Sequence, residues 1–279
     1  MHRLPRSLIG VTSLVCLGAV LSACAPVTGG SFDTLCEDPL VISCDRAAQS
    51  ALVVIDADAS AEDVIAFAES LHGATAVFAE PVSLEARSSH ALVLDPEVAP
   101  PFSWQIDLNA LQSTDLAASL RDTLEAASVP GAVGITRHSG WGFVTVQRIE
   151  QFEDVFDTLS QGVFASGATY TLQSMNERLR IVHVPDRTSA NAIHEIISIA
   201  QDYPDAEVLL ESMTSGPQSP TFSVARLTPP QQQELAARLR DSRWAGADVD
   251  GYPLEFVLGS IGEQGVTYVS GTFGDVPAG

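Results

Sequence analysis

Hydrophobic and polar positions along the chain alternate between two periods, and each switch between the periods marks a change of element. Residues 51–55 are a continuous run of Ala, Leu, Val and Ile, which predicts a short buried strand. Ser60 and Asp63 follow with the spacing of a helical capping box. Beyond them, apolar residues recur at helical spacing at Val64, Phe67, Ala68 and Leu71. The pattern therefore predicts a buried strand followed by an amphipathic helix.

The first half of the chain continues in the same manner. Leu116, Leu120 and Leu124 fall on one face of a predicted helix. Ser139-Gly140 supplies the turn of a predicted hairpin, because glycine adopts positive φ without strain. The predicted elements after the first helix are strands at 75–79 and 91–94, a helix at 114–127, hairpin strands at 132–137 and 142–147, and an additional amphipathic helix at 151–160.

The second half repeats this order. Thr228-Pro229-Pro230-Gln231 is a strong helix start, with proline at the first helical position and Gln231 closing a capping box. Ser189 caps the preceding helix. The predicted elements are a strand at 179–184, the helix after Ser189, strands at 207–210 and 221–227, the helix from Thr228, and hairpin strands at 254–258 and 266–269.

This recurrence predicts an internal repeat of the α+β class. Each half has the order of a βαββαβ(β) ferredoxin-like module, in which two helices cover one face of an antiparallel sheet. The first module spans residues 39–160 and the second spans residues 166–279, and each is long enough to bury its own core. A single sheet continuing through both modules stays open as an alternative.

The N-terminal segment has the features of an export signal. Arg3 and Arg6 precede a mostly apolar stretch at 8–20, which is too short to span a bilayer as a helix. Leu21-Ser22-Ala23-Cys24 then places a cysteine directly after small residues. The segment resembles a bacterial lipoprotein signal peptide with its lipobox. The remainder of the chain resembles no family.

The resemblance to lipoproteins implies a location. Residues 1–23 would be removed as a signal peptide, and Cys24 would carry a diacylglyceryl thioether with acyl chains such as palmitate. Two acyl chains anchor a protein stably. Residues 24–38 would form a tether, holding the body at the extracytoplasmic face of the cell membrane. The alternative is an ordinary signal peptide followed by a cysteine destined for a disulfide.

Charge narrows the range of partners. The chain has a formal net charge of −21, and all fourteen of its basic residues are arginine. Nucleic-acid affinity depends on cationic residues that neutralise phosphates, and anionic lipid would repel this body. The expected partners are therefore the membrane, through the lipid on Cys24, and a protein or polymer of the cell envelope. No nucleic acid is expected.

The cysteines predict one disulfide. Cys16 would leave with the signal peptide and Cys24 would be lipidated, so Cys36 and Cys44 remain as a pair in an oxidising compartment. Their bond would close a short loop and brace the tether against the first strand. Two cysteines without accompanying histidines do not form a zinc site.

The sequence predicts no catalytic site, no metal site and no cofactor. The pairs Asp56/Asp58 and Asp248/Asp250 suit helix entry and turns better than calcium binding. The cluster at 138–142 is explained by turn chemistry. Two histidines that bind one metal from a helix are four residues apart. This spacing does not occur among His72, His90, His183 and His194.

These observations predict a non-enzymatic lipoprotein that binds an envelope component. Trp141, at the predicted hairpin tip, and Trp244 are its expected contact residues. One alternative is an envelope hydrolase using carboxylates in a groove between the modules, such as Asp56, Asp58 or Glu211. A further alternative is a passive structural spacer.

Overall fold

The computed structural model describes most of the chain from Ser31 onward. The described residues are 31–46, 50–75, 82–87, 102–108, 115–138, 141–166, 169–184, 190–211, 221–249, 252–263 and 265–275. Several sequence-based predictions lie outside them: the signal peptide, Cys24, His90, the strand at 91–94, the turn Ser139-Gly140, Ser189 and Asp250.

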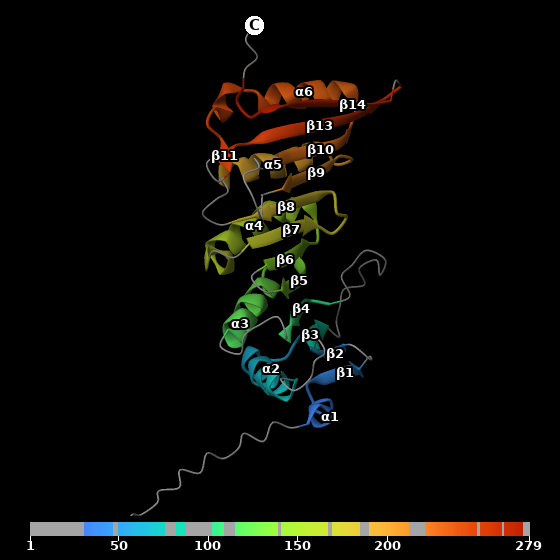
Figure 1. Cartoon of the computed structure of the whole chain (residues 1–279), viewed down its shortest axis with the longest axis vertical. Coiled ribbons are helices and arrows are strands. Elements are labelled where there is room, and N and C mark those ends of the chain that lie inside the picture. Colours follow the sequence, from blue (N-terminus) through green and yellow to red (C-terminus); the bar gives the residue numbers. More distant parts are fainter. Residues whose placement is uncertain are drawn as a thin grey trace, which may run out of the picture.

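A single mixed sheet of twelve strands organises the fold, and its strands lie side by side in the order of the sequence (Figure 1). The strands are β1 (Val41–Arg46), β2 (Ala51–Asp56), β3 (Val82–Arg87), β4 (Trp104–Asp107), β5 (Ala132–His138), β6 (Trp141–Val146), β7 (Thr169–Ser174), β8 (Leu179–His183), β9 (Glu207–Glu211), β10 (Thr221–Leu227), β13 (Glu255–Gly262) and β14 (Gly265–Thr272). A separate two-stranded ribbon pairs β11 (Asp248–Val249) with β12 (Tyr252–Pro253).

Helices connect every second pair of neighbouring strands. The helices are α1 (Phe32–Leu35), α2 (Ala61–Thr75), α3 (Leu116–Ala127), α4 (Phe152–Gln161), α5 (Ala190–Asp202) and α6 (Pro229–Leu239), with short 3₁₀ turns η2 (Ile149–Gln151), η3 (Val163–Ser166) and η4 (Ser242–Trp244). The strand pairs joined through α2 to α6 run parallel, whereas the pairs between them are antiparallel. The chain thus repeats one strand–strand–helix unit along the long axis seen in Figure 1.

The five longer helices, α2 to α6, cover the same face of the sheet. Cross-strand register aligns one row of apolar residues, each at most 4% exposed, through ten consecutive strands. The row belongs to the same core as the buried stripes of the helices. Its members are Ile55, Ala86, Trp104, Ile135, Val144, Leu172, Ile181, Leu210, Phe222 and Phe256. One core therefore runs the length of the sheet.

The prediction of two tandem ferredoxin-like modules with antiparallel sheets is wrong. In a split βαβ module the two strands joined by a helix are separated by another strand. Here each such pair is adjacent and parallel, as β6 is with β7 across the expected boundary between modules. The prediction also missed β1, β3, β4 and β7, while Thr75 belongs to the end of α2 and not to a strand.

The predicted capping box at Thr228 is present, and at Ser60 the hydroxyl half of the predicted box is present. The hydroxyl of Ser60 accepts from the backbone N–H of Asp63 at 3.2 Å and donates to its carboxylate at 2.7 Å. The backbone N–H of Thr228 donates to the side-chain oxygen of Gln231 at 2.9 Å. Both motifs satisfy backbone donors that a helix N-terminus leaves without partners. The helix starts could therefore be predicted from local sequence.

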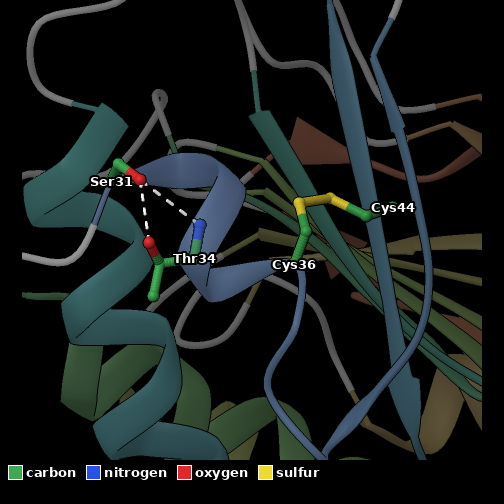
Figure 2. The surroundings of a disulfide bond; sticks show 4 residues. All are labelled: Ser31, Thr34, Cys36 and Cys44. Atoms are coloured by element: carbon green, nitrogen blue, oxygen red, sulfur yellow. Dashed lines mark hydrogen bonds between the residues drawn. A yellow bond between two sulfur atoms is a disulfide. The ribbon is translucent and has the colours of Figure 1, made fainter.

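The predicted disulfide between Cys36 and Cys44 is also present (Figure 2). It joins the end of α1 to β1, with 5.6 Å between the two Cα atoms. Ser31 caps α1 through a hydrogen bond from the Thr34 backbone N–H. Phe32 is buried in the core, so the last part of the segment expected to be a tether, residues 31–38, is folded against the body.

Among the described residues, no helix is both long enough and apolar enough to cross a bilayer.

Candidate functional site

The face of the sheet opposite the helices carries a group of uncharged side chains in its middle strands. Strand residues alternate between the two faces, so the neighbours of the buried row point to this other face. On β5, β6 and β7 they form what we call the aromatic strip, which consists of Thr136, Trp141, Phe143, Thr145, Thr169, Thr171 and Gln173. None of these seven side chains is ionisable, although the whole chain has a net charge of −21. Ionisable residues adjoin them in register, because His138 of β5 pairs with Trp141 and Arg180 of β8 pairs with Gln173.

The two aromatic rings of the strip are held in a defined arrangement. The rings of Trp141 and Phe143 stack with their centroids 6.0 Å apart and their planes 17° from parallel. The indole N–H of Trp141 donates to the hydroxyl of Thr171 at 2.9 Å, from β6 to β7. The Gln173 amide donates to the Thr145 hydroxyl at 3.4 Å. The bond to Thr171 fixes the orientation of the indole, and an ordered side chain loses less entropy in a contact than a mobile one.

Gly142, between the two aromatic residues of β6, allows the Tyr170 ring to pack closely against the strand backbone from the helix side. A Cβ atom at this position would lie 2.6 Å from Cδ1 of Tyr170. The Tyr170 ring therefore packs directly on the β6 backbone on the helix side, and its hydroxyl donates to the carbonyl of Val163 at 3.2 Å. Glycine at this point permits a close approach that any side chain would prevent.

Trp244 lies on the other side of the sheet. It ends the 3₁₀ turn η4 after α6 and packs against the core and the Phe273 ring. The Arg243 guanidinium lies 5.2 Å from the centroid of the Trp244 ring. The indole nitrogen of Trp244 is buried and has no hydrogen-bond partner among the described residues. The structure therefore does not bring Trp141 and Trp244 together in one contact surface.

His183 and His194 lie on either side of one phenylalanine ring. The Phe156 ring meets both imidazoles edge-on, at centroid distances of 5.2 Å to His183 and 6.0 Å to His194. Burial lowers the pKa of His183 to about 4. His194 contacts the Asp157 carboxylate at 2.8 Å and links α5 to α4. Both histidines belong to the packing beneath the helices.

Metal and cofactor sites do not emerge from the described part of the chain. It contains no group of three or more histidine, cysteine or acidic residues placed to share a metal ion. His72 lies in α2, whereas Asp248 lies in β11 of the separate two-stranded ribbon, so the two residues belong to distant elements of the chain. We assign no described side chain to a cofactor site.

The carboxylates considered for a hydrolase are far apart. Asp56 ends β2 and its carboxylate accepts from the backbone N–H of Asp58 at 2.9 Å, which shapes the entry to α2. Glu211 ends β9, seven strands away in the order of the sheet. At about 4.8 Å per strand this separation is about 34 Å, whereas glycosidase carboxylate pairs lie within about 10 Å. Asp56 and Glu211 cannot act on one bond.

A surface groove of about 480 Å³ lies between α1, the following turn and α2. Its apolar lining includes Leu35 and Phe67, and its carboxylates belong to Asp38 and Asp63. Both carboxylates already accept local hydrogen bonds, from the Leu40 backbone N–H and from Ser60. The groove therefore offers few free polar groups to orient a ligand.

Of the strip, the sequence singled out Trp141 and placed Thr136, Phe143 and Thr145 in predicted strands. The three residues of β7 were missed because that strand was not predicted, although Thr169–Ser174 alternates polar and apolar residues with a period of two. No protein-family model, curated protein or solved structure matches this chain.

Proposed function

We propose that this chain is a lipoprotein of the cell envelope, anchored through Cys24, whose body is a non-enzymatic binding module that uses the aromatic strip. The single observation that carries the binding role is the strip itself: an uncharged, aromatic surface on the face free of helices, in a strongly acidic chain. The lipobox at Leu21-Ser22-Ala23-Cys24 supports the location.

The chemistry of the strip favours a neutral, hydroxyl-rich ligand. Aromatic faces bury apolar ligand surface, while hydroxyl and amide side chains both donate and accept hydrogen bonds. A charged ligand would find no opposite charge among the seven strip residues, and the ionisable residues next to them in register, His138 and Arg180, adjoin only Trp141 and Gln173. Among the envelope components, these features favour a neutral stretch of polymer over an ionic ligand.

The anchoring is tested by fractionating a bacterial host that expresses the full chain. The unmodified chain is expected in the membrane fraction with a lipid-modified Cys24 detectable by mass spectrometry. The Cys24→Ser variant is expected to lose the membrane association. If both chains fractionate alike, the segment is an ordinary signal and the anchor is wrong.

The binding role is tested by co-sedimentation of the purified protein with isolated cell-wall polymer. We expect Trp141→Ala to raise the dissociation constant, measured from the retained fraction over a series of polymer concentrations, about tenfold, the loss of about 1.4 kcal/mol of binding free energy. Trp244→Phe is the matched control, because it changes an aromatic residue on the other side of the sheet. Equal retention of both variants and the unmodified protein would exclude the strip as the contact surface.

A further inference from the structure

The two edges of the sheet differ sharply in how they are protected. Edge strands expose unpaired backbone groups, and proteins usually blunt them with charges, bulges or covering elements. At one edge, the pairing of β1 with β2 is interrupted by a bulge between Val41 and Ser43, and β1 ends in Asp45 and Arg46. The disulfide from Cys44 also ties this edge to α1.

The opposite edge, β14, has neither a bulge nor charged residues of its own within the described residues, and one of its carbonyls, that of Ser270, accepts a hydrogen bond from Arg240 at the C-terminal end of α6. It pairs with β13 in unbroken register from Gly265 to Thr272. The eight residues Gly265–Thr272 include no charged residue and no proline. In the described part of the chain, no strand pairs with the outer side of β14. It is therefore a long, regular and uncharged edge.

Exposed apolar side chains adjoin this edge. Tyr268 is 73% exposed, and Ile261 and Val266 are 58% and 57% exposed. Ile261 pairs with Val266, and Tyr268 pairs with Gly259, so all three lie on the face opposite the helices. The Tyr268 ring lies over Gly259, where a Cβ atom would be 3.3 Å from its Cε1. Edge and patch together form one continuous surface.

We propose that β14 is a dimerisation edge, where two copies of this chain pair their β14 strands antiparallel about a twofold axis at Tyr268. An antiparallel pair centred on one residue keeps the helices of both copies on the same side, because directly opposed residues share a face. Tyr268 then faces Tyr268 of the partner copy, and Val266 faces Ser270. The two β14 strands supply each other's missing backbone partners, and the Ser270 carbonyl, which already accepts from Arg240, uses its second lone pair.

A second copy fits this edge better than a head-to-tail contact. Pairing β14 with β1 of another copy would produce an open filament, and the bulge and charged end of β1 oppose it. The twofold arrangement closes after two copies. It also brings the hairpin tip with Glu263 toward the partner segment where Arg240 binds the Ser270 carbonyl, which places opposite charges near each other.

The net charge of −21 does not prevent this contact. The pairing strands themselves are uncharged, and charges farther away than the Debye length of about 8 Å are largely screened at physiological ionic strength. Dimerisation is independent of ligand binding at the aromatic strip, which lies on β5 to β7.

The test is the mass of the purified Cys24→Ser chain in solution, where neither lipid nor a free thiol at that position contributes. We expect a dimer by sedimentation at micromolar concentration. Tyr268→Lys places like charges opposite each other and is expected to raise the dissociation constant at least about tenfold. Ile42→Lys is the control, since Ile42 is 55% exposed on the other edge and its change should leave the dimer intact.

A cysteine variant tests the register. Tyr268→Cys should form a disulfide between copies on mild oxidation, whereas Val266→Cys should not, because Val266 faces Ser270 and not itself. A monomer at all concentrations, which would leave β14 to a strand of another protein, overturns the proposal. So does a dimer weakened by Ile42→Lys, or one that Val266→Cys crosslinks as readily as Tyr268→Cys.

Discussion

The indole N–H of Trp141 on β6 and the hydroxyl of Thr171 on β7 form a hydrogen bond of 2.9 Å between neighbouring parallel strands. Thr171 is fully buried. We predict that Thr171→Val destabilises the protein by about 1 kcal/mol, because the indole loses its acceptor while the side-chain shape is kept. Thr145→Val is the control, since it removes a weaker bond of 3.4 Å. Urea unfolding measures both, and an equal loss would contradict the assignment.

Two glycines should respond to the same substitution with opposite signs. At Gly142, an alanine Cβ would meet the Tyr170 ring at 2.6 Å, so Gly142→Ala should cost about 1–3 kcal/mol. At Gly73, inside α2, a Cβ meets nothing within 4 Å, so Gly73→Ala should stabilise by about 0.5–1 kcal/mol. Thermal or urea unfolding decides it. A stabilised Gly142→Ala variant would show that Tyr170 can move away freely.

His183 should make stability depend on pH. Its pKa is about 4 in the folded protein and near 6.5 when unfolded, so the unfolded chain binds more protons between these values. Stability from this group is therefore present above pH 6.5 and falls as the pH drops toward 4, by about 2–3 kcal/mol between pH 7 and 4.5. His183→Asn removes the titration. Urea unfolding of both proteins at the two pH values gives the difference, and parallel pH curves would refute it.

Arg238 should couple α5 to α6. Its guanidinium, on α6, donates to the carboxylates of Glu195 and Asp202 on α5 at 2.6 Å each, and hydrogen bonding to Glu195 raises its pKa. Arg238→Met leaves the largely buried Glu195 carboxylate poorly paired, which should cost about 2 kcal/mol.

The control for this prediction is Arg226→Met. Arg226 pairs with Glu207 at 3.1 Å, but both side chains are more than half exposed, so the change should cost about 0.5 kcal/mol or less. Equal effects of the two variants in urea unfolding would mean that the α5–α6 ion pairs add no more than a surface pair does.

Local sequence was sufficient to predict the five longer helices and several strands, because caps and apolar stripes are short-range signals. Two of the missed strands, β3 and β7, do alternate polar and apolar residues with a period of two, but β3 shows only three apolar residues and β7 only two, and in β3 the polar position Glu85 is itself only 3% exposed. β4 has four residues, which is too few to show a period. The aromatic strip was partly missed because β7, which contributes three of its seven residues, was not predicted.

A general rule on the handedness of crossovers also made the single continuous sheet hard to predict from the sequence. Crossovers between parallel strands are nearly always right-handed. Here successive crossovers join strand pairs that run in opposite directions while their helices share one face. Such crossovers must alternate in hand. A topology with left-handed crossovers is the last to be considered from sequence, so two separate modules were the simpler expectation.

The order of the strands has a consequence for how the protein comes into being. Within the sheet, each strand after β1 hydrogen-bonds to the strand immediately before it in the order of the chain. A polypeptide that passes through a membrane pore with its N-terminus first would therefore find, for every newly emerged strand, a partner already waiting outside. No strand has to remain unpaired until a distant segment arrives, and such exposed intermediates are the ones that aggregate. The fold can grow as fast as the chain emerges.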